Sequence, residues 1–369
     1  MLAIEKLLGD IRRAALEAGA EGGKTASFLS SPARLLSVVA GGETRRTRNQ
    51  RKLGIPIPRF CLLSVTWRCN LKCVGCYARN YRPAEELSLD EIARVIREAC
   101  DLGCFLFVIV GGEPLMVDGL IETLSSERRG IFFLFTNGTR LRPKHAGAVD
   151  AAGNILPVVS VEGDRRLTDA RRGEGVGKKV FAAMRTLHDA DVAFGFSSMV
   201  THKNVETVTS RKWFDDVWDA GARFGFLIDY VPMPYGLDES LILTPEDRQR
   251  KATRLESRYA EARPLVLNFP PDEYASGSCQ SAGRGFFHIN ADGFAEPCPF
   301  SHYASENVRE KHLADILRCG FFGELRREFE GCANPEGHCM LFLHDDRVRQ
   351  IAARTGAHCT EAVSARVQA

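Results

Sequence analysis

The chain has 369 residues, of which 44% are hydrophobic and 26% charged, and its formal net charge is +2. This composition is typical of a globular protein, and the near-neutral charge argues against nucleic acid as a main partner. The longest apolar runs, 104–110 and 131–135, are too short for a transmembrane segment, which needs about 20 residues. Acidic residues interrupt residues 1–16, so we expect no signal peptide and a cytoplasmic location.

The chain contains twelve cysteines. In a reducing compartment this number favours metal or cluster binding over disulfide bonds. Cys61, Cys100 and Cys104 lie on apolar segments, so we expect these three thiols to be buried packing groups.

Residues 1–57 are expected to form an N-terminal helical and basic arm. Apolar residues recur near helical spacing between Ile4 and Leu16, and a stretch rich in Gly, Ser and Ala follows. Two interpretations remain for the basic residues that come next: a docking arm for an anionic partner, or a solvated linker that caps the bottom of the following barrel. The second is favoured. These residues are Arg45, Arg46, Arg48, Arg51 and Lys52.

From residue 58 to residue 235, strand-like apolar runs alternate with helical patterns. Near-continuous apolar runs indicate strands covered on both faces, and they occur at 60–66, 105–110, 131–135, 155–161, 192–200 and 224–231. Helices are predicted at 88–100, 115–126, 178–190 and 205–220. Six βα repeats predict a parallel sheet with right-handed crossovers. Since six units are too few for a complete eight-fold barrel, the predicted fold is α/β, a partial (β/α)6 TIM-like barrel.

Unusual motifs follow the predicted strands where ligands bind in such sheets, at the carboxyl ends. A three-cysteine loop follows the first strand, Gly111-Gly112-Glu113-Pro114 the second, and Thr136-Asn137-Gly138 the third. Ser160-Val161-Glu162-Gly163 ends the fourth. Each motif alone permits an ordinary turn or strand end. Their shared position predicts one site.

The loop after the first strand carries Cys69, Cys73 and Cys76. A 4Fe–4S cluster normally takes four cysteines, so three ligands leave one iron open to something that is not protein. A structural zinc site needs a fourth ligand, and none is adjacent in sequence. A zinc knuckle completed by a distant histidine is the alternative.

After residue 235 the alternation of strands and helices stops. Residues 236–278 are expected to form a helical linker, with a helix that starts at Thr244-Pro245-Glu246-Asp247 and runs to about residue 263. Residues 279–369 are expected to form a small cysteine-rich C-terminal extension. Within it, runs at 286–289 and 294–297 flank Asp292-Gly293, which predicts a hairpin.

The cysteine loop, the Gly111–Pro114 motif and the fourth strand end together resemble the radical S-adenosylmethionine (SAM) superfamily, over about residues 58–235. The resemblance implies that Cys69, Cys73 and Cys76 ligate a 4Fe–4S cluster. The amino and carboxylate groups of SAM then chelate the open iron. An electron from the reduced cluster cleaves the sulfonium C–S bond, and the resulting 5′-deoxyadenosyl radical abstracts hydrogen from a substrate.

The resemblance also places the Gly-Gly-Glu-Pro motif at the ammonium group of SAM. Gly111 and Gly112 would let the zwitterion approach the backbone, and Glu113 would accept from the ammonium. Tyr77 matches the position whose backbone and ring meet the adenine.

Ser160 and Glu162 match the residues that bind the ribose hydroxyls, although family members often carry Asp where this chain has Glu162. Asn137 and Ser198 are further candidate contacts. Arg172 either neutralises the SAM carboxylate or is a solvated surface charge.

The C-terminal extension resembles the SPASM and twitch modules, which hold auxiliary clusters. Cys279, Gly293 and Cys298 fit the opening of that pattern, but the later dense run of four cysteines is absent. We therefore expect one auxiliary iron–sulfur cluster; if only three cysteines bind it, the open iron could ligate substrate. Zinc on the same thiols is the alternative. The expected ligands are Cys279, Cys298, Cys332 and Cys339; Cys319 is expected to be buried, and His288, His302 and His338 lie near enough to replace a cysteine.

We expect a radical SAM enzyme that receives electrons from an external low-potential donor such as ferredoxin or flavodoxin. Its substrate is a peptide or protein side chain, a small metabolite or a lipid-like molecule. No recognisable peptide-binding domain precedes the barrel, which counts against a peptide. The alternative is a non-enzymatic iron–sulfur or zinc protein for electron transfer or scaffolding, which would leave the Gly-Gly-Glu-Pro motif without a purpose.

Overall fold

The computed structural model describes residues 32–81, 85–233, 238–259, 265–274, 279–332 and 339–361. The helix expected between Ile4 and Leu16, and His338, lie outside these ranges.

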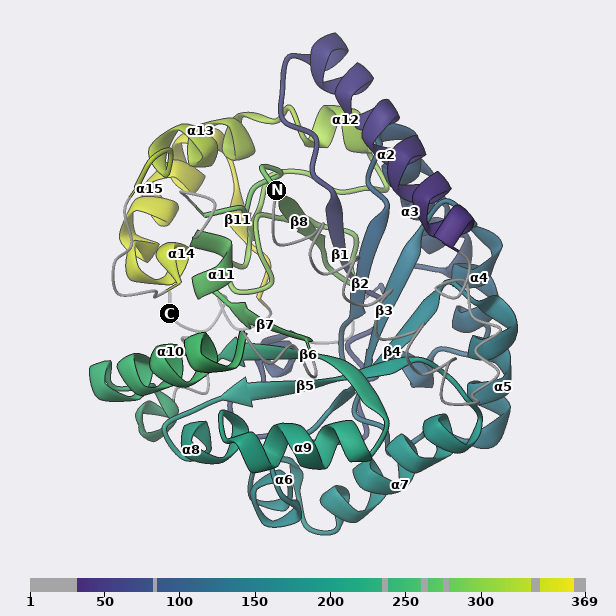
Figure 1. The fold of residues 1–369 in the computed structure, drawn as a ribbon. Helices are drawn as coiled ribbons and strands as arrows, with labels where there is room; N and C mark the ends of the chain where they lie inside the picture. Colours follow the sequence, from purple (N-terminus) through teal and green to yellow (C-terminus); the bar gives the residue numbers. More distant parts are fainter. Residues whose placement is uncertain are drawn as a thin grey trace.

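The six strands expected in the barrel are all present and form a continuous parallel sheet. They occur in the order β6-β5-β4-β3-β2-β1, so strands that follow one another in sequence are neighbours. The sheet curves and carries helices on its outer side (Figure 1). The predicted α/β partial barrel is therefore confirmed. The strands are β1 (Phe60–Ser64), β2 (Leu106–Val110), β3 (Ile131–Thr136), β4 (Ile155–Ser160), β5 (Phe194–Val200) and β6 (Ala222–Asp229).

Two of the outer helices show how the sequence sets their first residues. In α3 (Leu89–Leu102), Ser88 and Glu91 form the predicted capping box. The helix expected at 205–220 is two helices, α8 (Val205–Val208) and α9 (Arg211–Asp219), because Ser210 caps the second by accepting from the Trp213 N–H. The others are α4 (Leu120–Ser126), which follows η3 (Pro114–Met116), α5 (Pro143–Ala152), α6 (Arg165–Arg172) and α7 (Val176–Asp189).

The sheet extends beyond the six predicted strands at both edges. Strand β7 (Leu265–Phe269) pairs with β6 in parallel, so the interval 236–278, expected as a helical linker, also contributes a strand to the sheet. That interval also holds η4 (Glu239–Leu241), α10 (Pro245–Tyr259) and α11 (Pro271–Tyr274). At the other edge, β8 (Phe286–Ile289) pairs in parallel with β1 and antiparallel with β9 (Ala295–Glu296). The cysteine-rich segment is thus joined to the barrel through the strand that precedes the cysteine loop.

The remaining C-terminal elements lie beside β8, on the side of the barrel away from α4 and α5 (Figure 1). A short antiparallel pair, β10 (Tyr303–Ala304) with β11 (His358–Cys359), accompanies four helices. These are α12 (Leu313–Ile316), α13 (Gly320–Glu328), α14 (Met340–Leu343) and α15 (Asp345–Thr355). Within the described ranges, no helix is long and apolar enough to cross a membrane.

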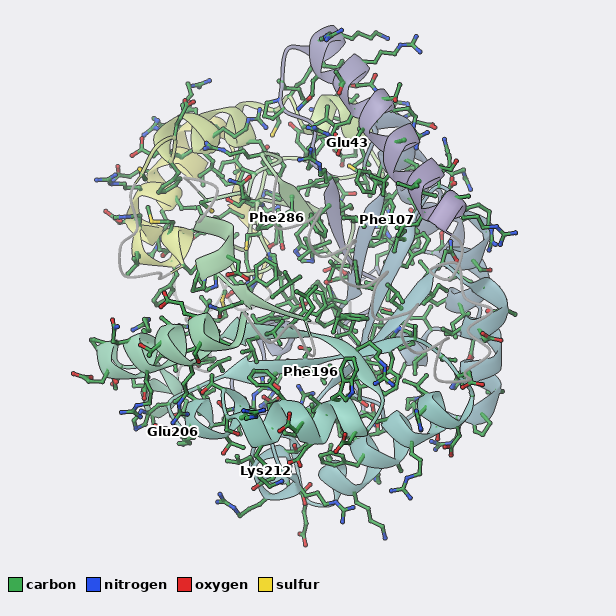
Figure 2. All side chains as sticks on the ribbon, viewed as in Figure 1. Glu43, Phe107, Phe196, Glu206, Lys212 and Phe286 are labelled. Atoms are coloured by element: carbon green, nitrogen blue, oxygen red, sulfur yellow. The ribbon has the colours of Figure 1, made fainter. Side chains whose placement is uncertain are left out.

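Two apolar cores hold the barrel, one on each face of the sheet. Phe107 and Phe196 belong to the core between the strands and the outer helices, whereas charged side chains such as Glu206 and Lys212 point outward (Figure 2). Phe133, Phe224 and their neighbours fill the inside of the barrel. The near-continuous apolar strands follow from burial on both faces.

A long helix, α2 (Pro32–Leu53), covers one end of the inner core. Leu35 and Val38 are buried in that core together with Phe105. Arg45 Nε donates to the Cys100 carbonyl at 2.7 Å, and Arg46 reaches the Ile57 carbonyl at 3.4 Å. This arginine pair therefore anchors the helix.

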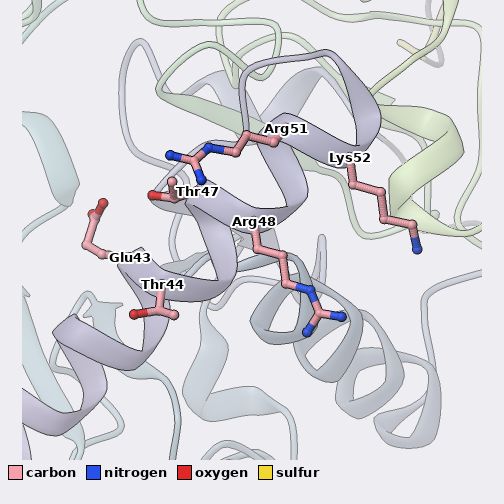
Figure 3. A pocket seen from close by; sticks show the side chains of 6 residues that line it. All are labelled: Glu43, Thr44, Thr47, Arg48, Arg51 and Lys52. Carbon is pink, nitrogen blue, oxygen red and sulfur yellow. The ribbon is translucent and has the colours of Figure 1, made fainter.

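The outer face of α2 carries the other three basic residues of the N-terminal run. Arg48, Arg51 and Lys52 line a pocket together with Glu43, Thr44 and Thr47 (Figure 3). None of the residues expected to bind SAM or a cluster lines this pocket. A docking role for this basic face stays a hypothesis.

Candidate active site

The cysteine loop is attached to the ends of neighbouring elements. Val74 N–H donates to the Arg171 carbonyl of α6 at 2.9 Å. Asn70 Nδ2 donates to Thr139 Oγ1 at 2.8 Å, and Asn70 Oδ1 accepts from Asn137 Nδ2 at 3.1 Å. These bonds bring the loop to the carboxyl ends of β3 and β4, as the motif positions predict.

The three loop thiols are electrostatic neighbours of one another and of the other motifs. Cys69 is an exposed residue, but the partial burial of its thiol raises its pKa, and Glu113, Cys73 and Cys76 raise it further. Burial also raises the pKa of Cys73, while the guanidinium groups of α6 oppose that rise. Because cluster ligation needs thiolates, the cations beside Cys73 favour the form that binds metal.

The thiols do not converge on a point in this structure. Among the described residues, no three His, Cys, Asp or Glu side chains form a group that could hold a single metal ion. Cys69 is exposed, Cys76 is partly exposed and Cys73 is buried.

The two glycines after β2 are required by the backbone of the cysteine loop. A Cβ on Gly111, whose φ is +128°, would lie 2.4 Å from the Thr66 carbonyl oxygen. A Cβ on Gly112 would lie 2.1 Å from the carbonyl oxygen of Arg68. The glycines therefore allow two strand-end loops to pack together. The approach of SAM to this backbone stays a prediction.

Glu113 locks its motif to β3. Its side chain is fully buried and accepts from Thr136 Oγ1 at 2.6 Å, Asn137 N–H at 2.7 Å and Leu115 N–H at 3.1 Å. Burial raises its pKa. The structure thus gives Glu113 a supporting role, and its expected contact with the SAM ammonium stays a prediction.

Glu162 lies at the centre of a buried ion-paired group. Its side chain is 1% exposed and lies 2.6 Å from Arg171 Nη1 and 2.5 Å from Arg172 Nη2. Burial alone would raise its pKa, but both guanidinium groups together hold the pKa below its usual value. Arg172 is itself only 10% exposed, which excludes the alternative of a solvated surface charge. Arg171 was not anticipated, although it stands next to Arg172.

The other predicted SAM contacts are placed unevenly. Asn137 Nδ2 lies 3.9 Å from Cys69 Sγ, within reach of the loop. Ser160 shares the inward face of β4 with Leu156 and Val158, and it is partly exposed. Both positions agree with a role at the site.

Ser198 lies on the face of β5 that is turned away from the barrel interior. It shares this face with Phe196 and Val200, which belong to the core beneath the outer helices. Its Oγ is buried and has no hydrogen-bond partner among the described residues. We therefore withdraw Ser198 as a SAM contact, because the alternation of β5 turns it away from the barrel interior.

Tyr77, directly after Cys76, faces the C-terminal extension. Its ring meets Phe300 edge-on with centroids 5.8 Å apart. Burial raises the pKa of its hydroxyl, as does the nearby Cys298 thiol. Tyr77 thus lies between a loop cysteine and an expected auxiliary ligand, and its expected contact with adenine stays a prediction.

The expected auxiliary ligands lie in two parts of the C-terminal segment. Cys279 and Cys298 are both buried, and the Ala282 N–H donates to the Pro297 carbonyl at 3.0 Å, which holds their two backbones together. Cys332 and Cys339 flank residues 333–338, which lie outside the described ranges. The structure therefore supports closeness only for the first pair.

Two of the histidines considered as replacement ligands are already engaged. Both ring nitrogens of His288 lie 2.8 Å from a partner, one from Ser64 and one from Glu296. His302 hydrogen-bonds Glu361 and the Pro299 carbonyl. Cys319 caps α13 by accepting from the Phe322 N–H. The structure gives all three residues local roles that differ from cluster ligation.

Fold and site together define a class: a parallel partial barrel with a three-cysteine loop and a polar group at the carboxyl ends of its strands. The family model described as "Radical SAM superfamily" matches residues 63–210. An AdoMet-dependent heme synthase from Methanosarcina barkeri is 28% identical to this chain, and the aligned region covers 70% of this chain and 82% of the synthase. A GTP 3′,8-cyclase from Parasynechococcus marenigrum is 30% identical, with coverages of 70% and 86%.

A solved structure shares the fold. The structure of Streptococcus suis SuiB bound to S-adenosylmethionine has a TM-score of 0.64 at 18% identity, and the match covers 77% of this chain and 71% of SuiB. The chain belongs to the radical SAM superfamily and is a radical SAM enzyme. The non-enzymatic alternative is thereby set aside.

Proposed function

We propose that Cys69, Cys73 and Cys76 hold a 4Fe–4S cluster with one iron open to SAM, and that catalysis starts with hydrogen abstraction from a substrate. The observation that carries this proposal is the set of three neighbouring thiols beside the Glu162–Arg171–Arg172 group, at the carboxyl ends of parallel strands. When bound, the cluster and SAM together supply reductive cleavage of the sulfonium C–S bond.

The protein groups around the thiols suit this chemistry. Arg171 and Arg172 offset negative charge near Cys73, and Glu162 fixes both guanidinium groups. We propose that Arg172 neutralises the SAM carboxylate. Ser160, partly exposed on the inward face of β4, would meet the ribose, and Asn137 would meet SAM beside Cys69.

Product formation tests the proposal. Anaerobically reconstituted protein is mixed with dithionite and SAM, and 5′-deoxyadenosine is measured by mass spectrometry. We expect product from the wild type and none from the Cys69→Ala/Cys73→Ala/Cys76→Ala variant. Wild-type protein with a complete cluster that leaves SAM intact would refute the proposal.

A second centre is proposed on Cys279, Cys298, Cys332 and Cys339. The burial and closeness of the first two support it, as does the engagement of His288 and His302 elsewhere. Iron and sulfide counts on the triple loop variant decide the matter: we expect about four irons per chain. Zinc alone would refute an auxiliary cluster.

We propose that the substrate is a peptide or protein side chain, a small metabolite or a lipid-like molecule. We propose an external low-potential donor such as ferredoxin or flavodoxin, because the proposed chemistry consumes an electron. A cytoplasmic location fits this proposal, since cluster thiolates need a reducing compartment.

A further inference from the structure

A buried carboxylate on β9 collects hydrogen bonds from several segments of the chain. Glu296 accepts from Tyr81 O–H at 2.9 Å, from Asn290 Nδ2 at 2.8 Å and from Thr360 Oγ1. His288 Nδ1 lies 2.8 Å from Glu296 Oε2, and neither side chain is exposed. Burying a carboxylate is costly unless it is paired and hydrogen-bonded, so four partners mark this carboxylate as a built feature.

One flank of the cysteine loop reaches Glu296 through His288. His288 Nε2 lies 2.8 Å from Ser64 Oγ, at the end of β1, the strand that leads into the cysteine loop. An ionised carboxylate only accepts, so His288 Nδ1 donates to Glu296. These contacts therefore connect Glu296 to the strand that precedes the cysteine loop.

The other flank reaches the same carboxylate through an aromatic stack. Trp67, two residues before Cys69, lies face to face with the ring of Tyr81, with centroids 3.8 Å apart and planes inclined by 3°. The hydroxyl of Tyr81 then donates to Glu296. Both ends of the loop are thus attached to one buried group of the C-terminal extension.

We propose that His288 and Glu296 form a clamp that positions the cysteine loop for SAM, with His288 acting as a positioning residue that does not touch SAM. The inference rests on the proposed function. His288, which was first considered as a cluster ligand, thereby has a role in positioning the loop. Substitution of the outer partners of a metal site commonly costs about 10–100-fold in metal affinity or activity, because these partners orient the inner groups.

Two substitutions at His288 test the clamp on anaerobically loaded holoenzyme. His288→Leu removes both bonds, whereas His288→Gln offers one donor and one acceptor. We expect the Leu variant, at full iron content, to bind SAM about tenfold more weakly and to show a weaker SAM-induced change in the EPR spectrum of the reduced cluster. The Gln variant should recover most of the affinity.

Asp247→Asn is the matched control. Asp247 also pairs with a histidine, with His202 Nδ1 2.7 Å away, and it is 3% exposed. It lies on α10, outside the loop and its partners, so we expect wild-type SAM affinity. Equal SAM affinity and equal spectra for His288→Leu and wild type would overturn the clamp, as would an equal loss in Asp247→Asn.

If His288→Leu does not fold, Thr360→Val replaces it. This variant removes one donor to Glu296 from the C-terminal end, and we expect a smaller loss of SAM affinity; no loss would overturn the clamp.

If the wild type binds no SAM, the proposed function fails, and the clamp is judged separately by EPR of the reduced loop cluster in the Cys279→Ala/Cys298→Ala background. A spectrum unchanged by His288→Leu or Thr360→Val then overturns it.

Discussion

At the scale of single residues, the site depends on charges placed where water cannot screen them. Glu162 and its two guanidinium partners are nearly inaccessible, so removing one partner leaves charge without compensation. The exposed group of Glu206 with Arg250 and Arg254 has similar chemistry in solvent. The two groups therefore predict different responses to the same substitution.

Glu162→Gln should lower the free energy of unfolding of the apoprotein by about 3 kcal/mol at pH 7, because both buried guanidinium groups lose their counter-charge. Glu206→Gln should change it by less than about 0.5 kcal/mol. Urea unfolding measures both. A smaller loss for Glu162→Gln than for Glu206→Gln would contradict the buried ion-paired group.

The loss should also depend on pH. Burial opposes ionisation of Glu162, but Arg171 and Arg172 hold its folded-state pKa below the usual 4.5. A lowered folded-state pKa gives stability that is complete above 4.5 and is lost as pH falls through the lowered value. The gap between wild type and Glu162→Gln should therefore narrow below about pH 4.5. A constant gap would refute this sign.

Gly112→Ala should displace the cysteine loop, because the added Cβ would lie 2.1 Å from the Arg68 carbonyl. We expect a clear loss of iron at the loop site, measured after reconstitution in a variant that lacks the four C-terminal cysteines. Gly147→Ala is the control: a Cβ at this position of α5 meets nothing within 4 Å. Wild-type iron content in Gly112→Ala would contradict the proposed packing.

At the scale of elements, the sequence allowed the six barrel strands to be predicted, because apolar runs buried on both faces are long and evenly spaced. Helices α3, α4 and α7 and the α8–α9 segment were also predicted, whereas α5 and α6 were not. Strand β7 was missed because a run of only five residues carries little periodicity. The placement of β8 beside β1 depends on pairing across more than 200 residues, which no local pattern records. The outward position of Ser198 could not be predicted, because it depends on which residues of β5 face the barrel interior, and only the structure shows this.

Helix α2 gives a test at the same scale. Leu35 is 4% exposed in the inner core, whereas its neighbour Leu36 is 61% exposed. Leu35→Ala should cost about 2–3 kcal/mol of unfolding free energy, and Leu36→Ala less than about 0.5 kcal/mol. Thermal and urea unfolding compare them. Equal small effects would show that α2 does not cover the barrel.

At the scale of the whole molecule, the C-terminal extension is part of the site's support. It pairs with β1, contacts Tyr77 and supplies Glu296. The cysteine motif itself could be recognised from spacing, since its chemistry is local. The clamp could not be recognised, because the partners of His288 and Glu296, which are Ser64, Tyr81 and Thr360, are far apart in sequence.

The most direct test of the central claim is whether SAM binds iron at the loop cluster. The experiment uses a variant in which the four C-terminal cysteines, Cys279, Cys298, Cys332 and Cys339, are replaced by alanine. The reduced protein receives SAM that carries 17O in its carboxylate and 15N in its amino group, and it is measured by electron–nuclear double resonance. We predict hyperfine coupling of the reduced cluster to both labels. A fully loaded cluster at Cys69, Cys73 and Cys76 with coupling to neither label would contradict an open iron that binds SAM.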